Sequence, residues 1–150
     1  MVDGLLEIDW HDLTALDISE AAVGKVRARL GYRAEAVKFA AADVRSWQPD
    51  RTYDAWHDRA VFHFLTEEAD RDHYVEIATE ALEPGGALVL ATFAADGPTK
   101  CSGLPTSRYN PEEPVHIFGA AFLLEHAESE EHSTPFDTIQ PLYSVVLRRR

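Results

Sequence analysis

Three short, largely apolar segments in the first sixty residues each end in an aspartate. They are Leu13–Asp17, Ala36–Asp43 and Thr52–Asp58. Their lengths suit strands of a sheet, and each is bounded by residues that stop a strand. The pattern therefore predicts three strands, each followed by an acidic side chain.

Apolar residues at helical spacing occupy the stretches between strands. Ser19–Gly31 opens with a residue suited to an N-cap and closes with one suited to a helix stop. Thr66–Leu82 carries the clearest apolar stripe in the chain, at intervals of three and four residues. Val2–Ile8 has the composition of the last turns of a helix. After Glu83–Gly86 breaks the long helix, a run apolar on both faces predicts a buried strand in the middle of a sheet.

The C-terminal part changes in pattern. Residues 121–132 and 139–149 alternate apolar and polar positions, and the turn-rich segment 133–138 joins them. This predicts an antiparallel hairpin at the edge of the sheet, with Pro141 at the strand start or on its open side. Residues 95–114 are rich in Gly, Pro and Ser, and a loop of this length in a compact domain is usually functional.

Alternating strands and helices predict one α/β domain over residues 1–150, with a Rossmann-like, mostly parallel sheet, helices on both faces and a C-terminal antiparallel hairpin. Ligands of such sheets bind beyond the carboxyl ends of the strands. Asp17, Asp43 and Asp58 are therefore expected to line one rim. The alternative for each acid is a local role as a helix cap or turn former.

Charge and composition exclude several classes of protein. The 150 residues carry 14 Lys and Arg against 26 Asp and Glu, a net charge of −12 that would repel a nucleic-acid backbone. One cysteine allows neither an intrachain disulfide nor a thiolate zinc cluster. The acidic start does not resemble a signal peptide, and no apolar run is long enough to cross a bilayer. We expect a cytoplasmic protein with no nucleic-acid or membrane partner.

Five sequence stretches together resemble the class I S-adenosylmethionine-dependent methyltransferases of the small single-domain type. They are "ALDIS", "FAAADV", "YDAWHDRAVFHFL", "ALEPGGALVLATF" and "CSGLP". The resemblance covers nearly the whole chain and implies methyl transfer from S-adenosyl-L-methionine to a small-molecule substrate.

Position by position, the resemblance implies a cofactor site. It places Asp17 on the ribose hydroxyls, Ile18 on the adenine face, and Asp43 on the adenine amino group with Val44 beside it. The chemistry is consistent, since a carboxylate can accept from a vicinal diol and an exocyclic amine needs an acceptor. Asp58 is expected near the methionine end of the cofactor.

The segment from His57 to Leu65 occupies the place where members of this family approach the substrate. Arg59 could orient a charged group there, and His63 could act as a general base because its pKa is ordinarily near neutrality. A histidine packed in the core is an equal alternative. The spacing of His57 and His63 matches no common zinc motif, so no metal is expected.

The Gly- and Pro-rich loop takes the place of the family's substrate-covering loop, so Cys101 and Arg108 are candidate substrate contacts. A nucleophilic cysteine is unnecessary, because in methyl transfer the acceptor attacks directly and the enzyme works by positioning.

The chain departs from the family pattern in one respect. A glycine-rich loop about 20 residues before Asp17 would fall before Met1, so the family's first strand is predicted to be missing. Unpaired strand edges would then favour a homodimer, and cofactor binding would be weak. The alternative function is an inactive methyltransferase-fold remnant acting as a binding or dimerisation module. A dinucleotide oxidoreductase fits less well, because it needs the same loop.

Overall fold

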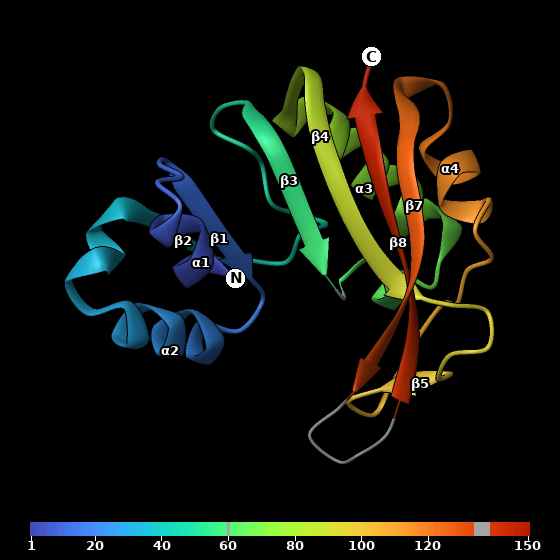
Figure 1. The fold of residues 1–150 in the computed structure, drawn as a ribbon, viewed down its shortest axis with the longest axis horizontal. Helices are drawn as coiled ribbons and strands as arrows, with labels where there is room; N and C mark the ends of the chain where they lie inside the picture. Colours follow the sequence, from blue (N-terminus) through green and yellow to red (C-terminus); the bar gives the residue numbers. More distant parts are fainter. Residues whose placement is uncertain (60, 134–138) are drawn as a thin grey trace. The chain divides into compact units, whose positions relative to one another are not determined.

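The computed structural model describes residues 1–59, 61–133 and 139–150, which form two compact units, Met1–Trp47 and Gln48–Arg150. The two units are built on separate sheets (Figure 1). The prediction of one domain over residues 1–150 stays a prediction.

The first unit consists of a two-stranded parallel sheet and the helices that flank it. Its elements are α1 (Val2–Glu7), β1 (Leu13–Asp17), α2 (Glu20–Leu30), the 3-10 helix η1 (Gly31–Ala36) and β2 (Val37–Ala41). In the parallel pairing Leu13 lies opposite Val37, and Asp17 lies opposite Ala41. The side chain of Ser19 caps α2, and Gly31 ends it with a φ of 57°. Both limits of this helix agree with the sequence prediction.

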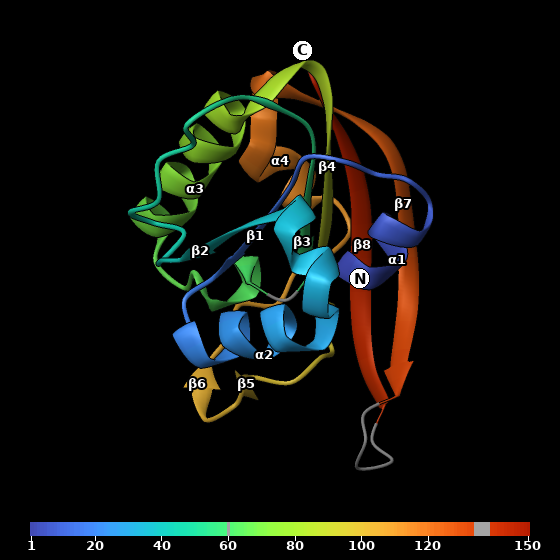
Figure 2. The same cartoon turned by 90° about the vertical axis from the view of Figure 1, so that its left-hand side faces the viewer.

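The second unit contains the larger sheet. Its elements are β3 (Tyr53–Arg59), η2 (Phe62–Phe64), α3 (Glu68–Ala81), β4 (Leu82–Phe93), β5 (Lys100–Cys101), β6 (Leu104–Pro105), α4 (Glu113–Phe118), η3 (Gly119–Ala121), β7 (Phe122–Ser133) and β8 (Ile139–Arg149). The strand order is β3-β4-β8-β7, and β5 pairs with β6 in a small separate hairpin. Figure 2 shows α3 and α4 on the same side of the four-stranded sheet.

The predicted fold class is confirmed: the chain has a Rossmann-like α/β fold with a mixed sheet and a C-terminal antiparallel strand pair. β3 and β4 are parallel. β8 lies between β4 and β7 and is antiparallel to both. The predicted turn at 133–138 lies almost entirely outside the described residues. Pro141 is near the start of β8, where its carbonyl accepts from the N–H of Ala94.

Aromatic side chains form the centre of the second unit's core. The ring of Phe62 lies 5.1 Å from Tyr74 and 5.5 Å from Phe118, and Phe118 lies 5.4 Å from Phe122. Aromatic rings at these separations add to the free energy gained by burial. The cluster ties α3 and α4 to the segment that follows β3.

Two local features differ from the sequence prediction. The strand expected to begin at residue 87 begins at Leu82, and the Glu83–Gly86 segment is absorbed as an irregularity in its pairing with β3. The long loop at 95–114 contains the β5–β6 hairpin and the start of α4. Both differences arise from backbone hydrogen bonding between strands, which the pattern of apolar residues does not predict.

Candidate functional site

Asp17 lies at the carboxyl end of β1, with its side chain exposed. Its Oδ1 accepts from the backbone N–H of Ser19 (2.8 Å), and the hydroxyl of Ser19 accepts in turn from the N–H of Ala22 (3.2 Å). Oδ2 of Asp17 has no partner within residues 1–59, 61–133 and 139–150. The strand-to-helix turn therefore fixes this carboxylate and leaves one oxygen available to a ligand.

Ile18 follows directly and is 71% exposed. The exposed side chain places apolar surface in contact with water, next to the carboxylate of Asp17. Val44, in contrast, is buried. The first unit thus presents an acid and an adjacent apolar side chain at the same strand end.

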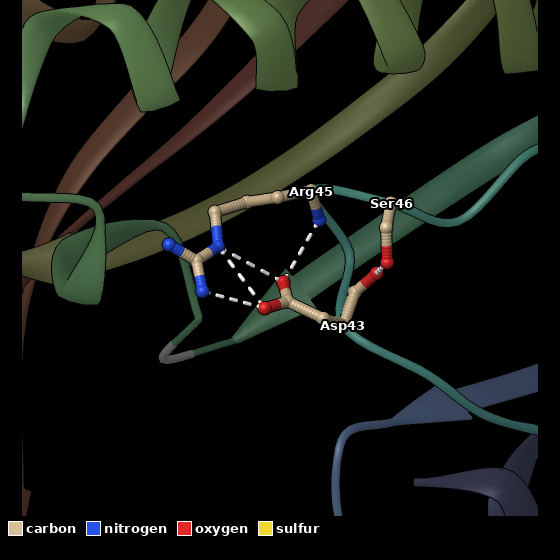
Figure 3. Close-up of polar contacts among 3 residues, drawn as sticks. All are labelled: Asp43, Arg45 and Ser46. Carbon is tan, nitrogen blue, oxygen red and sulfur yellow. Dashed lines mark hydrogen bonds and ion pairs between the residues drawn. The ribbon is translucent and has the colours of Figure 1, made fainter.

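Asp43 follows β2, which is parallel to β1, so both acids lie at the same end of the two-stranded sheet. Its carboxylate is held by Arg45, as Figure 3 shows. Nη2 of Arg45 donates to Oδ2 (2.6 Å), Nε donates to both oxygens (3.1 Å each), and the backbone N–H of Arg45 donates to Oδ1 (2.9 Å). These hydrogen bonds lower the pKa of Asp43.

Asp58 lies in β3 and is 4% exposed. Its Oδ2 accepts from the hydroxyl of Tyr74 (2.6 Å), and its Oδ1 accepts from the N–H of Val61 (2.9 Å). Burial raises the pKa of Asp58, and the hydrogen bond from Tyr74 opposes that rise. Both oxygens are used inside the second unit, so the geometry favours a structural role over the predicted cofactor contact.

His63 is fully buried. Its ring stacks on Phe93 at 4.3 Å and packs on Phe64 at 4.5 Å. Within the described part of the chain, neither ring nitrogen has a hydrogen-bond partner. Burial lowers the pKa of His63 to about 4, so the ring is neutral at pH 7.

The remaining predicted substrate contacts lie apart from one another in the second unit. Arg59 donates from Nη2 to Oε1 of Glu130 (3.2 Å) and lies 3.2 Å from Nδ1 of His132. Cys101 is partly exposed in the β5–β6 hairpin.

Arg108 lines an open groove of about 940 Å³ between α3, α4 and the loop before α4. Arg71 also lines this groove and donates to the carbonyls of Leu65 (3.1 Å) and Thr66 (2.8 Å). Glu113 and His116 line its α4 side. Volumes in this range accommodate small ligands.

Two residues that matter here were not singled out from the sequence. Arg45 follows Asp43 by two positions in a turn, a spacing that allows a local ion pair. Tyr74 belongs to the helical stripe, and the apolar residues around it in the sequence do not predict that its hydroxyl contacts a buried acid.

Among the described residues no three His, Cys, Asp or Glu side chains gather closely enough to hold a metal ion. None of the described helices has the length and apolarity needed to span a membrane.

A family model described as "Methyltransferase domain" matches residues 5–86, which is more than half of the chain. The chain belongs to this methyltransferase-domain family. The resemblance inferred from the sequence is therefore confirmed, and no curated protein matches the chain in sequence.

Solved structures of methyltransferases share the fold of this methyltransferase domain. The N-methyltransferase NodS from Bradyrhizobium japonicum WM9 is 18% identical with a TM-score of 0.72, over 91% of this chain and 72% of NodS. The 1,6-didemethyltoxoflavin-N1-methyltransferase from Burkholderia thailandensis is 21% identical with a TM-score of 0.74, over 99% of this chain and 65% of that chain. Its structure contains 1,6-didemethyltoxoflavin and S-adenosylhomocysteine, and NodS has also been solved with S-adenosylhomocysteine.

Proposed function

We propose that this methyltransferase-domain protein binds S-adenosyl-L-methionine and catalyses methyl transfer to a small-molecule acceptor. The observation that carries the proposal is the placement of Asp17 and Asp43 at the carboxyl ends of two parallel strands, with Ile18 exposed beside Asp17. Open α/β sheets bind ligands at that position. The solved methyltransferases with bound S-adenosylhomocysteine support the same class of cofactor.

The residues of the first unit fit the nucleoside part of this cofactor. Oδ2 of Asp17 is available to a ribose hydroxyl, while Oδ1 is kept in place by the N–H of Ser19. Ile18 offers an apolar face to the adenine ring, and Asp43 is the acceptor for its amino group. Arg45 already donates hydrogen bonds to the carboxylate of Asp43, so the adenine amino group must compete with Arg45 for that carboxylate.

The cofactor would supply a methyl group on a positively charged sulfur, and the chain's own residues would orient the acceptor. We assign the acceptor to the groove beside Arg108, where a guanidinium group without a partner among the described residues can hold an anionic or carbonyl oxygen. His63 is assigned to packing rather than to proton transfer, because its ring is buried against Phe93. Cys101 and Arg59 remain proposed substrate contacts.

We further propose that cofactor binding is weak. Within residues 1–150, Asp17 and Asp43 are assigned only to the ribose and the adenine, and a few hydrogen bonds to charged groups hold a nucleoside weakly. The cytoplasmic location stays a prediction.

Binding of S-adenosylhomocysteine tests the proposal directly. Asp17→Ala should weaken the affinity measured by calorimetry about 10- to 100-fold, which corresponds to the loss of hydrogen bonds to a charged group. Glu35→Ala removes the same charge from an exposed site of the first unit and should leave the affinity unchanged. Failure of the parent protein to bind at millimolar concentration, or equal affinity of the Asp17 variant, would refute the cofactor site.

An inactive binding or dimerisation module is the second candidate. β1 pairs only with β2, and β3 pairs only with β4, among the described residues. A strand with one free edge can pair with another chain. Light scattering over a range of concentrations should show a homodimer, and a monomer at every concentration would remove the basis for this candidate.

A further inference from the structure

We infer that Arg45 competes with the adenine amino group for the carboxylate of Asp43 and so sets both the affinity and the base selectivity of the nucleoside site. The inference rests on the proposed function, because it concerns the same site. It assigns a role to a residue that neither the family match nor the sequence motifs single out.

Three N–H groups of Arg45 occupy most of the acceptor directions of Asp43. A carboxylate offers about four lone-pair directions. Oδ1 receives the backbone N–H and the Nε–H of Arg45, and Oδ2 receives Nε–H and Nη2–H, over distances of 2.6 to 3.1 Å (Figure 3). The single Nε–H is shared between the two oxygens, so a further donor such as an adenine amino group competes with Arg45 for the acceptor directions that these three N–H groups use.

The contact is nevertheless weak enough to be displaced. The side chain of Arg45 is 47% exposed and that of Asp43 is 27% exposed, so water competes for both groups. Exposed ion pairs contribute little, and displacing one lowers the affinity for a competing ligand by a factor of up to about five. Arg45 therefore reduces nucleoside affinity without abolishing it.

Selectivity follows from the chemistry of the two bases that differ at this edge. Adenine presents an amino group, which a free carboxylate accepts. Hypoxanthine presents an oxygen, which a free carboxylate repels and a guanidinium group can bind. With Arg45 in place the site discriminates poorly between adenosine and inosine, and without it the discrimination increases.

Calorimetry with adenosine and inosine tests the inference on the full chain. Arg45→Ala should bind adenosine up to about fivefold more tightly than the parent protein and inosine no more tightly, so the affinity ratio increases. In an Asp43→Ala background, removal of Arg45 should leave the affinity for adenosine unchanged, because there is no carboxylate left to compete for. Lys25→Ala, which removes one positive charge from the exposed surface of α2, is the matched control and should behave as the parent protein.

Two further measurements separate this inference from the proposed function. High salt should reduce the difference between the parent protein and Arg45→Ala, because adenosine is neutral and salt weakens only the ion pair. Without any ligand, the pKa of the Asp43 carboxyl by NMR should rise in Arg45→Ala toward its ordinary value.

If adenosine binds, Asp43→Ala weakens it and Arg45→Ala changes nothing or weakens it, the inference is wrong while the proposed function stands. If no variant binds a nucleoside, both are wrong.

Discussion

The hydroxyl of Tyr74 donates a 2.6 Å hydrogen bond to Oδ2 of Asp58, and both side chains are buried in the second unit. Asp58 comes from β3 and Tyr74 from α3, so the bond fastens the helix to the end of the strand. Burial raises the pKa of both groups, and the short bond satisfies an acid that has little access to water.

Replacing Tyr74 by phenylalanine tests the energetic role of that bond. Tyr74→Phe keeps the ring contacts with Phe62 and leaves Oδ2 of Asp58 buried without this donor, so we expect the free energy of unfolding to fall by about 1–3 kcal/mol. Urea denaturation at pH 7 measures the change. Tyr32→Phe, at a side chain 87% exposed, should change it by less than about 0.5 kcal/mol. Equal effects of the two substitutions would contradict a structural role for the pair.

Stability should depend on pH through His63. Its pKa is about 4 in the folded chain and 6.5 in the unfolded one, so between these values the unfolded chain binds the extra proton. The stabilisation is complete above pH 6.5 and is lost as the pH falls toward 4, by about 3 kcal/mol at most. The raised pKa of Asp58 acts in the opposite direction above pH 3.8, so the comparison between variants isolates the histidine.

His63→Phe should flatten this part of the profile, because it removes the titrating group and keeps an aromatic ring against Phe93. The free energy of unfolding measured from pH 4 to 7 for parent and variant gives the difference. His126→Gln, at an exposed histidine of β7, should retain the slope of the parent protein. A variant profile parallel to that of the parent would show that His63 titrates normally.

Gly86 occupies a position at which a side chain cannot be placed. A Cβ there would lie 2.8 Å from the carbonyl oxygen of Glu83 and 3.2 Å from that of Asp54. Gly86→Ala should therefore lower the free energy of unfolding by about 1–3 kcal/mol, as overpacking does. Gly24→Ala is the control of opposite sign, since α2 has open space there and alanine favours a helix by about 0.5–1 kcal/mol. Thermal or urea unfolding distinguishes the two, and a neutral Gly86→Ala would mean that the turn adjusts.

Ile18 should contribute to binding and not to stability. Ile18→Ser removes the apolar face offered to adenine, so we expect adenosine affinity to fall about five- to tenfold, consistent with partial loss of the burial of one isoleucine side chain. The free energy of unfolding should stay within about 0.5 kcal/mol, because the side chain is 71% exposed. Ile8→Ser, at an isoleucine 66% exposed in the same unit, should leave both quantities unchanged. Similar losses of affinity in both variants would argue against a specific adenine contact.

The local sequence was enough to predict the family and most of the longer helices and strands. The limits of α2 follow from Ser19 and Gly31, whose effects act within one turn of helix. The pairing of β7 with β8 follows from alternation along two adjacent segments. The positions of Asp17 and Asp43 follow from the ends of two strands, and parallel strands bring their carboxyl ends to the same side.

Tertiary structure alone decided what each acid can do. The sequence presents Asp17, Asp43 and Asp58 as three similar residues at strand ends. In the folded chain Asp17 keeps an oxygen available, Asp43 is bound by Arg45, and Asp58 is buried against Tyr74. Burial and hydrogen-bond partners depend on residues distant in sequence or on the exact path of a turn. The sequence by itself therefore determined that the carboxylates lie at the ends of strands. Only the three-dimensional structure determined which of them is available to a ligand.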